Sequence, residues 1–329
     1  MNTATSIDVR SIAVDNYDCA PNSQDLKNEA LSGLSQSPKT LSPKFFYDEE
    51  GSKIFDEICK LDEYYVTRSE MTLLKNIQPQ LREMLQIEFN LLEYGCGSSE
   101  KVKLVLDAAP HCKAYAAIDI SKEALWQLAE NISESYPNLH VISVCGDFLK
   151  AREIPWNGTS AYKKIAFFPG SSIGNLKPEE ALSFLRDITQ TVGSGGGLLI
   201  GVDLKKDEKI LHAAYNDNQG VTARFNKNAL RHINRECGAN FNLDQFEHFA
   251  FYNEAAGRVE MHLKSLCEQV VKIDDTEIFF EKDESIHTEN SYKYHPAEFQ
   301  FLARRAGWRA MHCWIDKAKT FSIHYFELP

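Results

Sequence analysis

The chain has 329 residues, enough for one large domain or two modest ones with a sizeable buried core. Its apolar fraction of 43% and charged fraction of 25% exclude a disordered or fibrous protein. The formal net charge is −11, and the lysines and arginines are scattered along the chain. This charge disfavours nucleic acids and anionic membrane surfaces as partners, because both reward a basic patch.

The beginning of the chain and its cysteines indicate a cytoplasmic protein. Residues 1–18 contain no continuous apolar stretch, so we expect neither a signal peptide nor an anchor. No later stretch is apolar enough over the length that a membrane span needs. The eight cysteines form no Cys-x-x-Cys pair, which is typical of reduced core residues. Since the ten histidines also lack ligand spacing, we expect no metal site.

The N-terminal region begins with about forty polar residues, which we expect to wrap the surface. A helix is predicted over 52–61 and a longer one over 68–85, where apolar residues recur at three- and four-residue intervals. Pro79 is expected to kink or split the longer helix, because proline removes a backbone donor.

The middle of the chain alternates between short apolar runs and helical patterns. The apolar runs indicate buried strands at 89–94, 114–118, 141–144, 164–168 and 198–204. The helical patterns lie between them, at 100–109, at 122–135 and from Pro178 onward. This β-α alternation predicts a parallel sheet covered by helices on both faces.

The alternation stops after residue 204. Helices are predicted over 207–215 and 222–237, and extended strands over 258–273 and 277–294, as in an antiparallel sheet. A last helix, 296–306, precedes two strands at 310–315 and 320–328, whose four-residue link is too short for a parallel crossover. A mostly parallel sheet that ends in such a C-terminal antiparallel hairpin resembles the α/β core of Rossmann-like class I methyltransferases.

These patterns predict two domains. We expect a methyltransferase core at 68–204 and 292–329, and a discontinuous α+β substrate-binding domain at 9–67 and 205–291. Residues 1–8 are expected to be flexible.

Polar residues follow three of the predicted parallel strands. A turn with Gly95 and Gly97 ends the first, Asp119 ends the second, and Asp147 with Phe148 ends the third. Carboxylates suit ribose hydroxyls and an adenine amino group, and a phenylalanine ring packs on the adenine face. The dinucleotide fingerprint lacks its third glycine because position 100 is Glu, which disfavours a pyrophosphate and tolerates a sulfonium.

The sequence resembles the histidine-specific Nα-methyltransferases, which convert L-histidine to its trimethyl betaine in ergothioneine biosynthesis. The resemblance runs from about residue 39 to the C-terminus and depends on seven short motifs in the same order. The motifs are FFYD at 45–48, EYYVTR at 63–68, YGCGSSEK at 94–101, VCGDF at 144–148, GSSIGNL at 170–176, FNKN at 225–228 and TENS at 288–291.

The resemblance implies the cofactor S-adenosyl-L-methionine and no metal. The residues that it assigns to the cofactor are Gly95, Lys101, Asp119, Asp147 and Phe148. Lys101 would pair with the methionine carboxylate, although from the sequence alone a solvated helix lysine is the more common interpretation.

The resemblance also implies a set of substrate-binding residues. Tyr64, Asn175 and Tyr215 would bind the substrate carboxylate, Tyr47 would lie at the α-amine as the catalytic residue, Glu289 and Ser291 would contact the imidazole, and Gly170 and Met261 would complete the pocket. Taken singly, each tyrosine is a common packing residue, and Asn175 is a common helix cap.

The chemistry agrees with these roles. Methyl transfer is an in-line displacement on a neutral amine, so positioning supplies most of the catalysis. Three successive transfers need a pocket that accepts a growing alkylammonium, and tyrosine faces attract such a cation. No strong general base is evident, so Tyr47 or water relays the proton. A substrate without a ring N–H would leave the Glu289 carboxylate unpaired.

The expected function is therefore three methyl transfers from S-adenosylmethionine to L-histidine, in a monomeric enzyme. Another aromatic amino acid, tryptophan or tyrosine, or an indole precursor is an alternative substrate, which Glu289 together with Met261 disfavours. A nicotinamide-dependent oxidoreductase is disfavoured by the missing third glycine and by the C-terminal hairpin. A non-catalytic binding module is disfavoured by the intact Gly95, Asp119 and Asp147.

Overall fold

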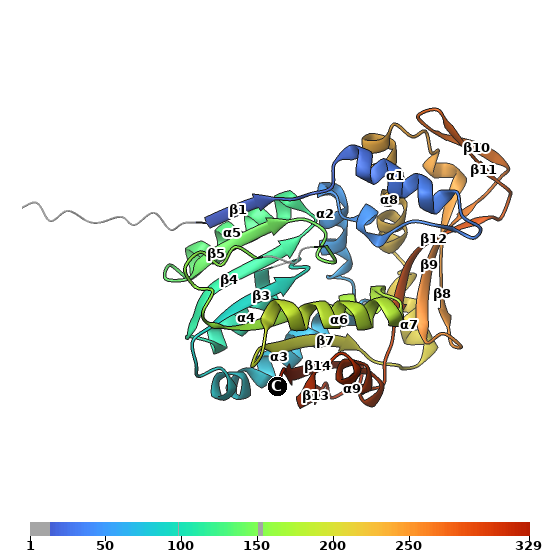
Figure 1. The fold of residues 1–329 in the computed structure, drawn as a ribbon. Helices are drawn as coiled ribbons and strands as arrows, with labels where there is room; N and C mark the ends of the chain where they lie inside the picture. Colours follow the sequence, from blue (N-terminus) through green and yellow to red (C-terminus); the bar gives the residue numbers. More distant parts are fainter. Residues whose placement is uncertain (1–13, 98, 151–153) are drawn as a thin grey trace, which may run out of the picture.

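The computed structural model describes residues 14–97, 99–150 and 154–329. The predicted flexible segment 1–8 lies outside the described residues. Two regions stand side by side, a large twisted sheet with flanking helices and a smaller α+β region (Figure 1). Among the described helices, none combines the length and the apolar character needed to cross a bilayer.

The large sheet is built from eight strands. They are β1 (Val14–Asp18), β3 (Phe89–Tyr94), β4 (Cys112–Asp119), β5 (His140–Cys145), β6 (Lys163–Phe168), β7 (Gly197–Asp203), β13 (Arg309–Ile315) and β14 (Phe321–Glu327). Their order is β1-β5-β4-β3-β6-β7-β14-β13, parallel from β1 to β7, with β14 antiparallel to β7 and β13 antiparallel to β14. The predicted parallel sheet with a C-terminal antiparallel hairpin is thus confirmed.

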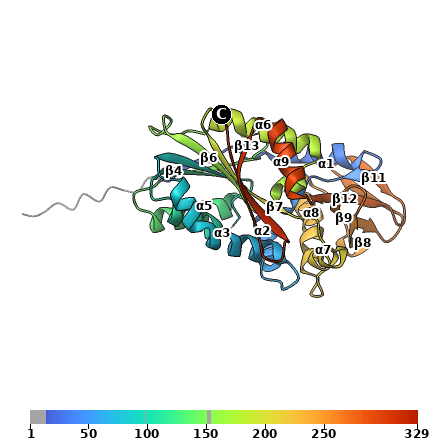
Figure 2. The same ribbon diagram turned by 90° about the horizontal axis from the view of Figure 1, so that it is seen from below.

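Helices cover both faces of this sheet (Figure 2). One face carries α3 (Tyr65–Met84), α4 (Ser99–Ala108) and α5 (Lys122–Ser135), whose buried apolar side chains form one core with the strands. The other face carries α6 (Pro178–Val192) and α9 (Pro296–Arg305) over a second core. Burial on both faces explains why the central strands are continuously apolar.

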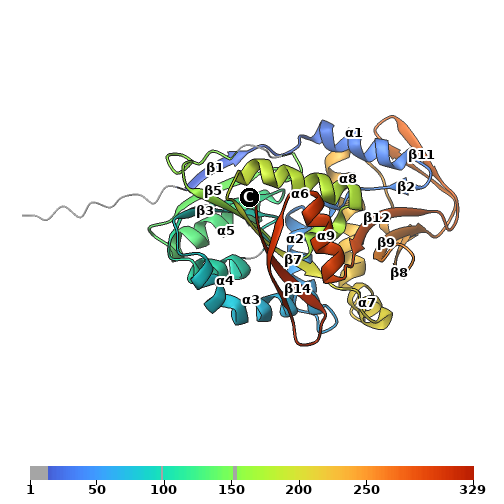
Figure 3. The same cartoon turned by 60° about the horizontal axis from the view of Figure 1, so that its bottom comes forward.

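The smaller region has a third core of its own. Its helices are α1 (Ser23–Leu34), η1 (Pro43–Phe46), α2 (Glu49–Ile58), α7 (Glu208–Tyr215), α8 (Val221–Cys237) and η3 (Leu243–Gln245). Its strands are β2 (Lys39–Thr40), β8 (Phe246–Asn253), β9 (Arg258–Ser265), β10 (Gln269–Ile273), β11 (Thr276–Phe280) and β12 (Ser285–Tyr292). They form the sheet β2-β12-β9-β8 and a separate β10-β11 hairpin, seen beside α8 in Figure 3.

The N-terminal region differs from its prediction. β1 pairs with β5 in the large sheet, whereas the sequence predicts that residues 9–67 belong to the other domain. The polar sequence of β1 suits an edge strand, and a strand of this kind has no apolar alternation to reveal it. α1 does more than wrap the surface, because a capping box at Asn22 and Asp25 starts it and Leu34 is buried in the third core.

Pro79 does not split its helix. α3 runs through it as one helix of 20 residues. Its buried face, which includes Leu74 and Ile77, packs against the large sheet together with α4. Tertiary packing therefore outweighs the local cost of the proline.

Candidate active site

Three of the predicted cofactor residues lie at the carboxyl ends of adjacent parallel strands. The backbone N–H of Gly95 donates to the carbonyl of Ile118 at 2.8 Å, and that of Gly146 donates to the carbonyl of Asp119 at 2.8 Å. These bonds bring the segments after β3, β4 and β5 together, as expected for neighbouring strands of one parallel sheet. Gly95, Asp119 and Asp147 therefore lie along one edge.

The Asp119 carboxylate organises this edge. Its two oxygens accept backbone N–H groups, from Cys96 at 3.0 Å and from Ser121 at 2.8 Å. Burial raises the pKa of Asp119, and these N–H groups act in the opposite direction. Oδ2 also accepts from the Cys96 thiol at 3.6 Å, a weak donor that a ligand hydroxyl could replace.

A glycine and a phenylalanine face each other at the same edge. Gly95 has φ of +68°, a conformation that favours glycine. A Cβ at this position would lie 4.0 Å from Cε1 of Phe148. The Phe148 ring itself packs against Phe168 at 5.5 Å and Phe184 at 5.4 Å, so it is held in place as a flat apolar wall.

Lys101 is not a solvated helix lysine. Its Nζ lies 2.7 Å from Oε2 of Glu70, whose side chain is completely buried. Both oxygens of Glu70 also accept the backbone N–H of Gly170 at 2.9 Å. Glu70, which the sequence did not single out, thereby ties the start of α4 to the loop after β6 and holds Lys101 beside Gly170.

The predicted catalytic residue and all seven predicted substrate-binding residues line one pocket between the two regions. They are Tyr47, Tyr64, Gly170, Asn175, Tyr215, Met261, Glu289 and Ser291. Asn175 ends the short helix η2 (Ser172–Asn175), and Lys177 occupies the N-cap position of α6. The alternative interpretation of Asn175 as the helix cap is therefore wrong.

One wall of the pocket is aromatic. Phe55 contacts the ring of Tyr47 at 5.8 Å and that of Tyr64 at 6.3 Å between centroids, and Phe225 contacts Tyr47 at 5.5 Å. Burial raises the pKa of Tyr47 well above its usual value, and the nearby Glu289 carboxyl adds to the rise. Tyr47 therefore stays a neutral phenol at physiological pH and cannot act as a phenolate base.

The opposite, polar wall depends on a β-bulge in β12. Along the antiparallel pair of β12 and β9, His287 lies opposite His262, and Glu289 lies opposite the next residue, Met261. Thr288 therefore has no partner on β9 and is the extra residue of the bulge. Because side chains alternate along a strand, this extra residue turns Glu289 and Ser291 to the inner face. Without it they would lie on the outer face with His287.

The Glu289 carboxyl is the acidic group of this wall. Burial raises its pKa to about 8, and the nearby Lys293 acts in the opposite direction. Among the residues that the structure describes, none hydrogen-bonds to this carboxyl. A ligand N–H in the pocket would thus meet an acceptor without a competing protein donor.

A buried charge network, which the sequence did not reveal, supports the polar wall. Lys293 is 2% exposed, and its Nζ lies 2.7 Å from Oδ2 of Asp203. Oδ1 of Asp203 pairs with Lys206 at 2.6 Å, and the hydroxyl of Tyr65 donates to Asp203 at 2.8 Å. Two lysines and one aspartate are thus buried together, a costly arrangement unless each charge is paired.

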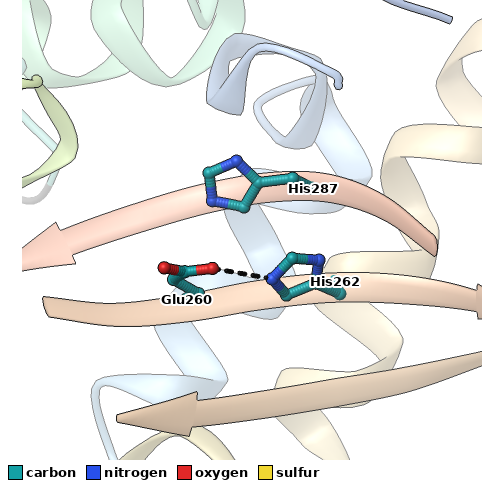
Figure 4. Close-up of side chains that lie close together, drawn as sticks. All are labelled: Glu260, His262 and His287. Carbon is teal, nitrogen blue, oxygen red and sulfur yellow. Dashed lines mark hydrogen bonds and ion pairs between the residues drawn. The ribbon is translucent and has the colours of Figure 1, made fainter. Parts of the chain in front are cut away.

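On the outer face of the same sheet, Glu260, His262 and His287 place their polar atoms within 4.8 Å of one another (Figure 4). We expected no metal-ligand set because the spacing along the chain showed none, and strand pairing brings this one together. Arg258 already binds Glu260 at 2.7 Å, and Nε2 of His262 lies 3.1 Å from the same carboxylate. The group is thus satisfied as an ion-pair network in which a cation would compete with Arg258.

The strand order and the acidic residues at the ends of β4 and β5 define a class I methyltransferase. A family model described as "Histidine-specific methyltransferase, SAM-dependent" matches residues 26–328. The chain belongs to this family.

Several known proteins are similar over most of the chain. A protein named "Histidine N-alpha-methyltransferase" from Mycolicibacterium smegmatis is 37% identical over 95% of this chain and 98% of its own length. A protein of the same name from Mycobacterium tuberculosis is 37% identical over 91% of this chain and 93% of its own. An "L-tryptophan methyltransferase" from Psilocybe serbica is 25% identical over 91% of each chain.

Proposed function

We propose that this enzyme transfers methyl groups from S-adenosylmethionine to the α-amine of L-histidine, three times in succession, to form the trimethyl betaine used in ergothioneine biosynthesis. The observation that carries the proposal is that one pocket combines an aromatic wall with the Glu289 carboxyl. The similarity to two proteins named histidine N-alpha-methyltransferase supports it.

The pocket's chemistry fits the proposed substrate. Glu289 accepts a ring N–H, and Met261, paired with it across the sheet, bounds the ring on the same face. Tyr64 and Asn175 supply neutral donors for the substrate carboxylate, and Tyr215, whose hydroxyl proton goes to Ser291, lines the pocket with them. Neutral donors leave the cationic sulfonium without a repelling charge nearby.

The cofactor would lie along the edge formed by Gly95, Asp119 and Asp147. Asp119 would accept the ribose hydroxyl protons, and the Phe148 ring would pack on the adenine. When bound, S-adenosylmethionine supplies an electrophilic methyl group on its sulfonium. Lys101, held by Glu70 next to Gly170, would meet the methionine carboxylate at the boundary between the two sites.

The chain's own residues would position the amine and remove its proton. Tyr47 would relay the proton to water as a neutral phenol. Its raised pKa excludes a phenolate in the resting enzyme. The faces of Tyr47, Tyr64 and Phe225 would stabilise each alkylammonium by cation–π attraction. The successive products can then stay bound for the next transfer.

We further propose that the residues of the smaller region act as the substrate-binding domain, that the enzyme needs no metal, and that it works as a monomer in the cytoplasm.

Replacement of Glu289 tests the assignment. Glu289→Ala removes the acceptor for the ring N–H and leaves that donor without a partner in the bound state. We expect the affinity for histidine to fall about 100-fold or more while the affinity for S-adenosylmethionine changes less than about threefold. Isothermal titration calorimetry with each ligand measures both. An equal loss for the two ligands, or no loss for either, would contradict the role of Glu289.

A further inference from the structure

The buried lysine at the polar wall has three hydrogen-bond partners, and together they use all its donors. Nζ of Lys293 lies 2.7 Å from Asp203, 2.7 Å from Oγ of Ser291 and 3.0 Å from the hydroxyl of Tyr215. An ammonium carries three N–H groups and no acceptor. Both hydroxyl oxygens must therefore accept from Lys293.

The two hydroxyls also bond to each other. The Tyr215 hydroxyl donates to Oγ of Ser291 at 2.7 Å. The pair owns two protons, and their mutual bond uses one. The second proton, that of Ser291, has to donate elsewhere, and both residues line the pocket. The polar wall thus offers one hydroxyl donor next to one carboxylate acceptor, the side chain of Glu289.

We propose that Lys293 is a positioning residue that fixes the Ser291–Tyr215 pair as a single hydrogen-bond donor. The pocket then accepts a neutral imidazole, whose N–H donates to Glu289 and whose unprotonated nitrogen accepts from the Ser291 hydroxyl. This inference rests on the proposed function. A neutral imidazole has one donor and one acceptor, which pair with the one acceptor and the one donor of the polar wall. An imidazolium, with two N–H groups, would place a donor against a donor.

Asp203 keeps Lys293 in the protonated form that this arrangement needs. Burial is the largest single influence on the pKa of Lys293 and acts to lower it, but Asp203 and Tyr215 together outweigh burial and the pKa is raised. The same carboxylate also pairs with Lys206, which bonds to Tyr65 and has neither Ser291 nor Tyr215 among its partners. The chain therefore contains a matched lysine with the same anionic partner and no contact with the two hydroxyls.

The first arm of the test uses the unmodified enzyme. Two isomers of pyrrolylalanine keep one ring N–H and replace the other ring nitrogen by C–H. Because the hydroxyl proton then faces a C–H group, we expect both isomers to bind about 10- to 100-fold more weakly than histidine, measured by calorimetry with S-adenosylhomocysteine present. Affinity for either isomer within about threefold of that for histidine would overturn the proposal.

The second arm compares Lys293→Met with Lys206→Met. Without the ammonium, the two hydroxyls can reorient their protons, so the preference for histidine over the pyrrolyl isomers should shrink to about threefold or less in Lys293→Met. Lys206→Met should keep the full preference. If both variants lose the preference, or if Lys293→Met retains it, Lys293 has no specific positioning role.

Two safeguards keep the test decisive. If Lys293→Met does not fold, Lys293→Gln replaces it, because its neutral amide keeps a polar group at this buried position and can also accept a hydrogen bond, so the same loss of preference is expected. Absence of histidine methylation by the unmodified enzyme would overturn both this inference and the proposed function. Methylation of histidine without the pyrrolyl discrimination would overturn this inference alone.

Discussion

At the polar end of the pocket, two influences act in opposite directions on the pKa of the Glu289 carboxyl. Burial raises it, and the buried Lys293 lowers it. Burial dominates, and the pKa lies at about 8 instead of near its usual 4.5. Lys293 acts on the pKa of Glu289, and Glu289 in turn acts to raise the pKa values of three tyrosines around the pocket, Tyr215, Tyr64 and Tyr47. A carboxyl whose charge strengthens the hydrogen bond to an imidazole N–H therefore titrates within the working pH range.

This pKa makes a prediction for histidine binding. As pH falls from 8 to 6.5, Glu289 gains a proton and loses the negative charge that strengthens its hydrogen bond to the ring N–H, so histidine affinity should weaken about tenfold. Glu289→Gln is the control, since its amide oxygen accepts the same N–H and does not titrate. Calorimetry across this pH range measures both proteins. An equally steep pH dependence in Glu289→Gln would show that another group is responsible.

On the scale of elements, the position of Glu289 depends on the bulge at Thr288. The hydroxyl of Thr288 lies 2.7 Å from Oδ1 of Asn226 and 3.0 Å from the carbonyl of Met261, and these contacts attach the extra residue to α8 and β9. Nε2 of His287 lies 3.1 Å from the carbonyl of Glu289 and supports the other side. The bulge is therefore held by specific bonds on both flanks.

Removing the Thr288 hydroxyl should weaken both the fold and the site. Thr288→Val keeps the shape but leaves buried acceptors unpaired, so the free energy of unfolding should drop by about 1–3 kcal/mol. Histidine affinity should fall while that for S-adenosylmethionine stays. Urea titration and calorimetry measure the two effects, with the exposed Thr276→Val as a control expected within about 0.5 kcal/mol of the unmodified protein. Unchanged stability and histidine affinity would mean that Thr288 does not hold the bulge.

The central strands were predictable from sequence, and the bulge was not. Strands such as Phe89–Tyr94 are buried on both faces, so their apolar runs are unmistakable. The bulge has no sequence signature, and the 258–294 region gives only an extended pattern that could place Glu289 on either face. The eight residues of β8, Phe246–Asn253, alternate irregularly in burial and were not predicted as a strand.

At the scale of the whole molecule, the site lies where the large sheet and the smaller region meet. The resemblance located the pocket residues because short motifs mark them, as with Tyr64 and Asn175. It did not locate Glu70, Asp203 or Lys293, whose roles exist only through pairings between distant parts of the chain, such as Glu70 with Lys101. Partners of this kind cannot be derived from one sequence without its fold.

The measurement that tests the central claim most directly is a mass-spectrometric assay of the unmodified protein with S-adenosylmethionine and, in separate reactions, histidine, tryptophan and tyrosine. The account predicts stepwise mass gains on histidine that end at three methyl groups, with little or no gain on the other two. Methylation of tryptophan or tyrosine without methylation of histidine would keep the fold and the cofactor, and would contradict the assignment of Glu289 and Ser291 to an imidazole.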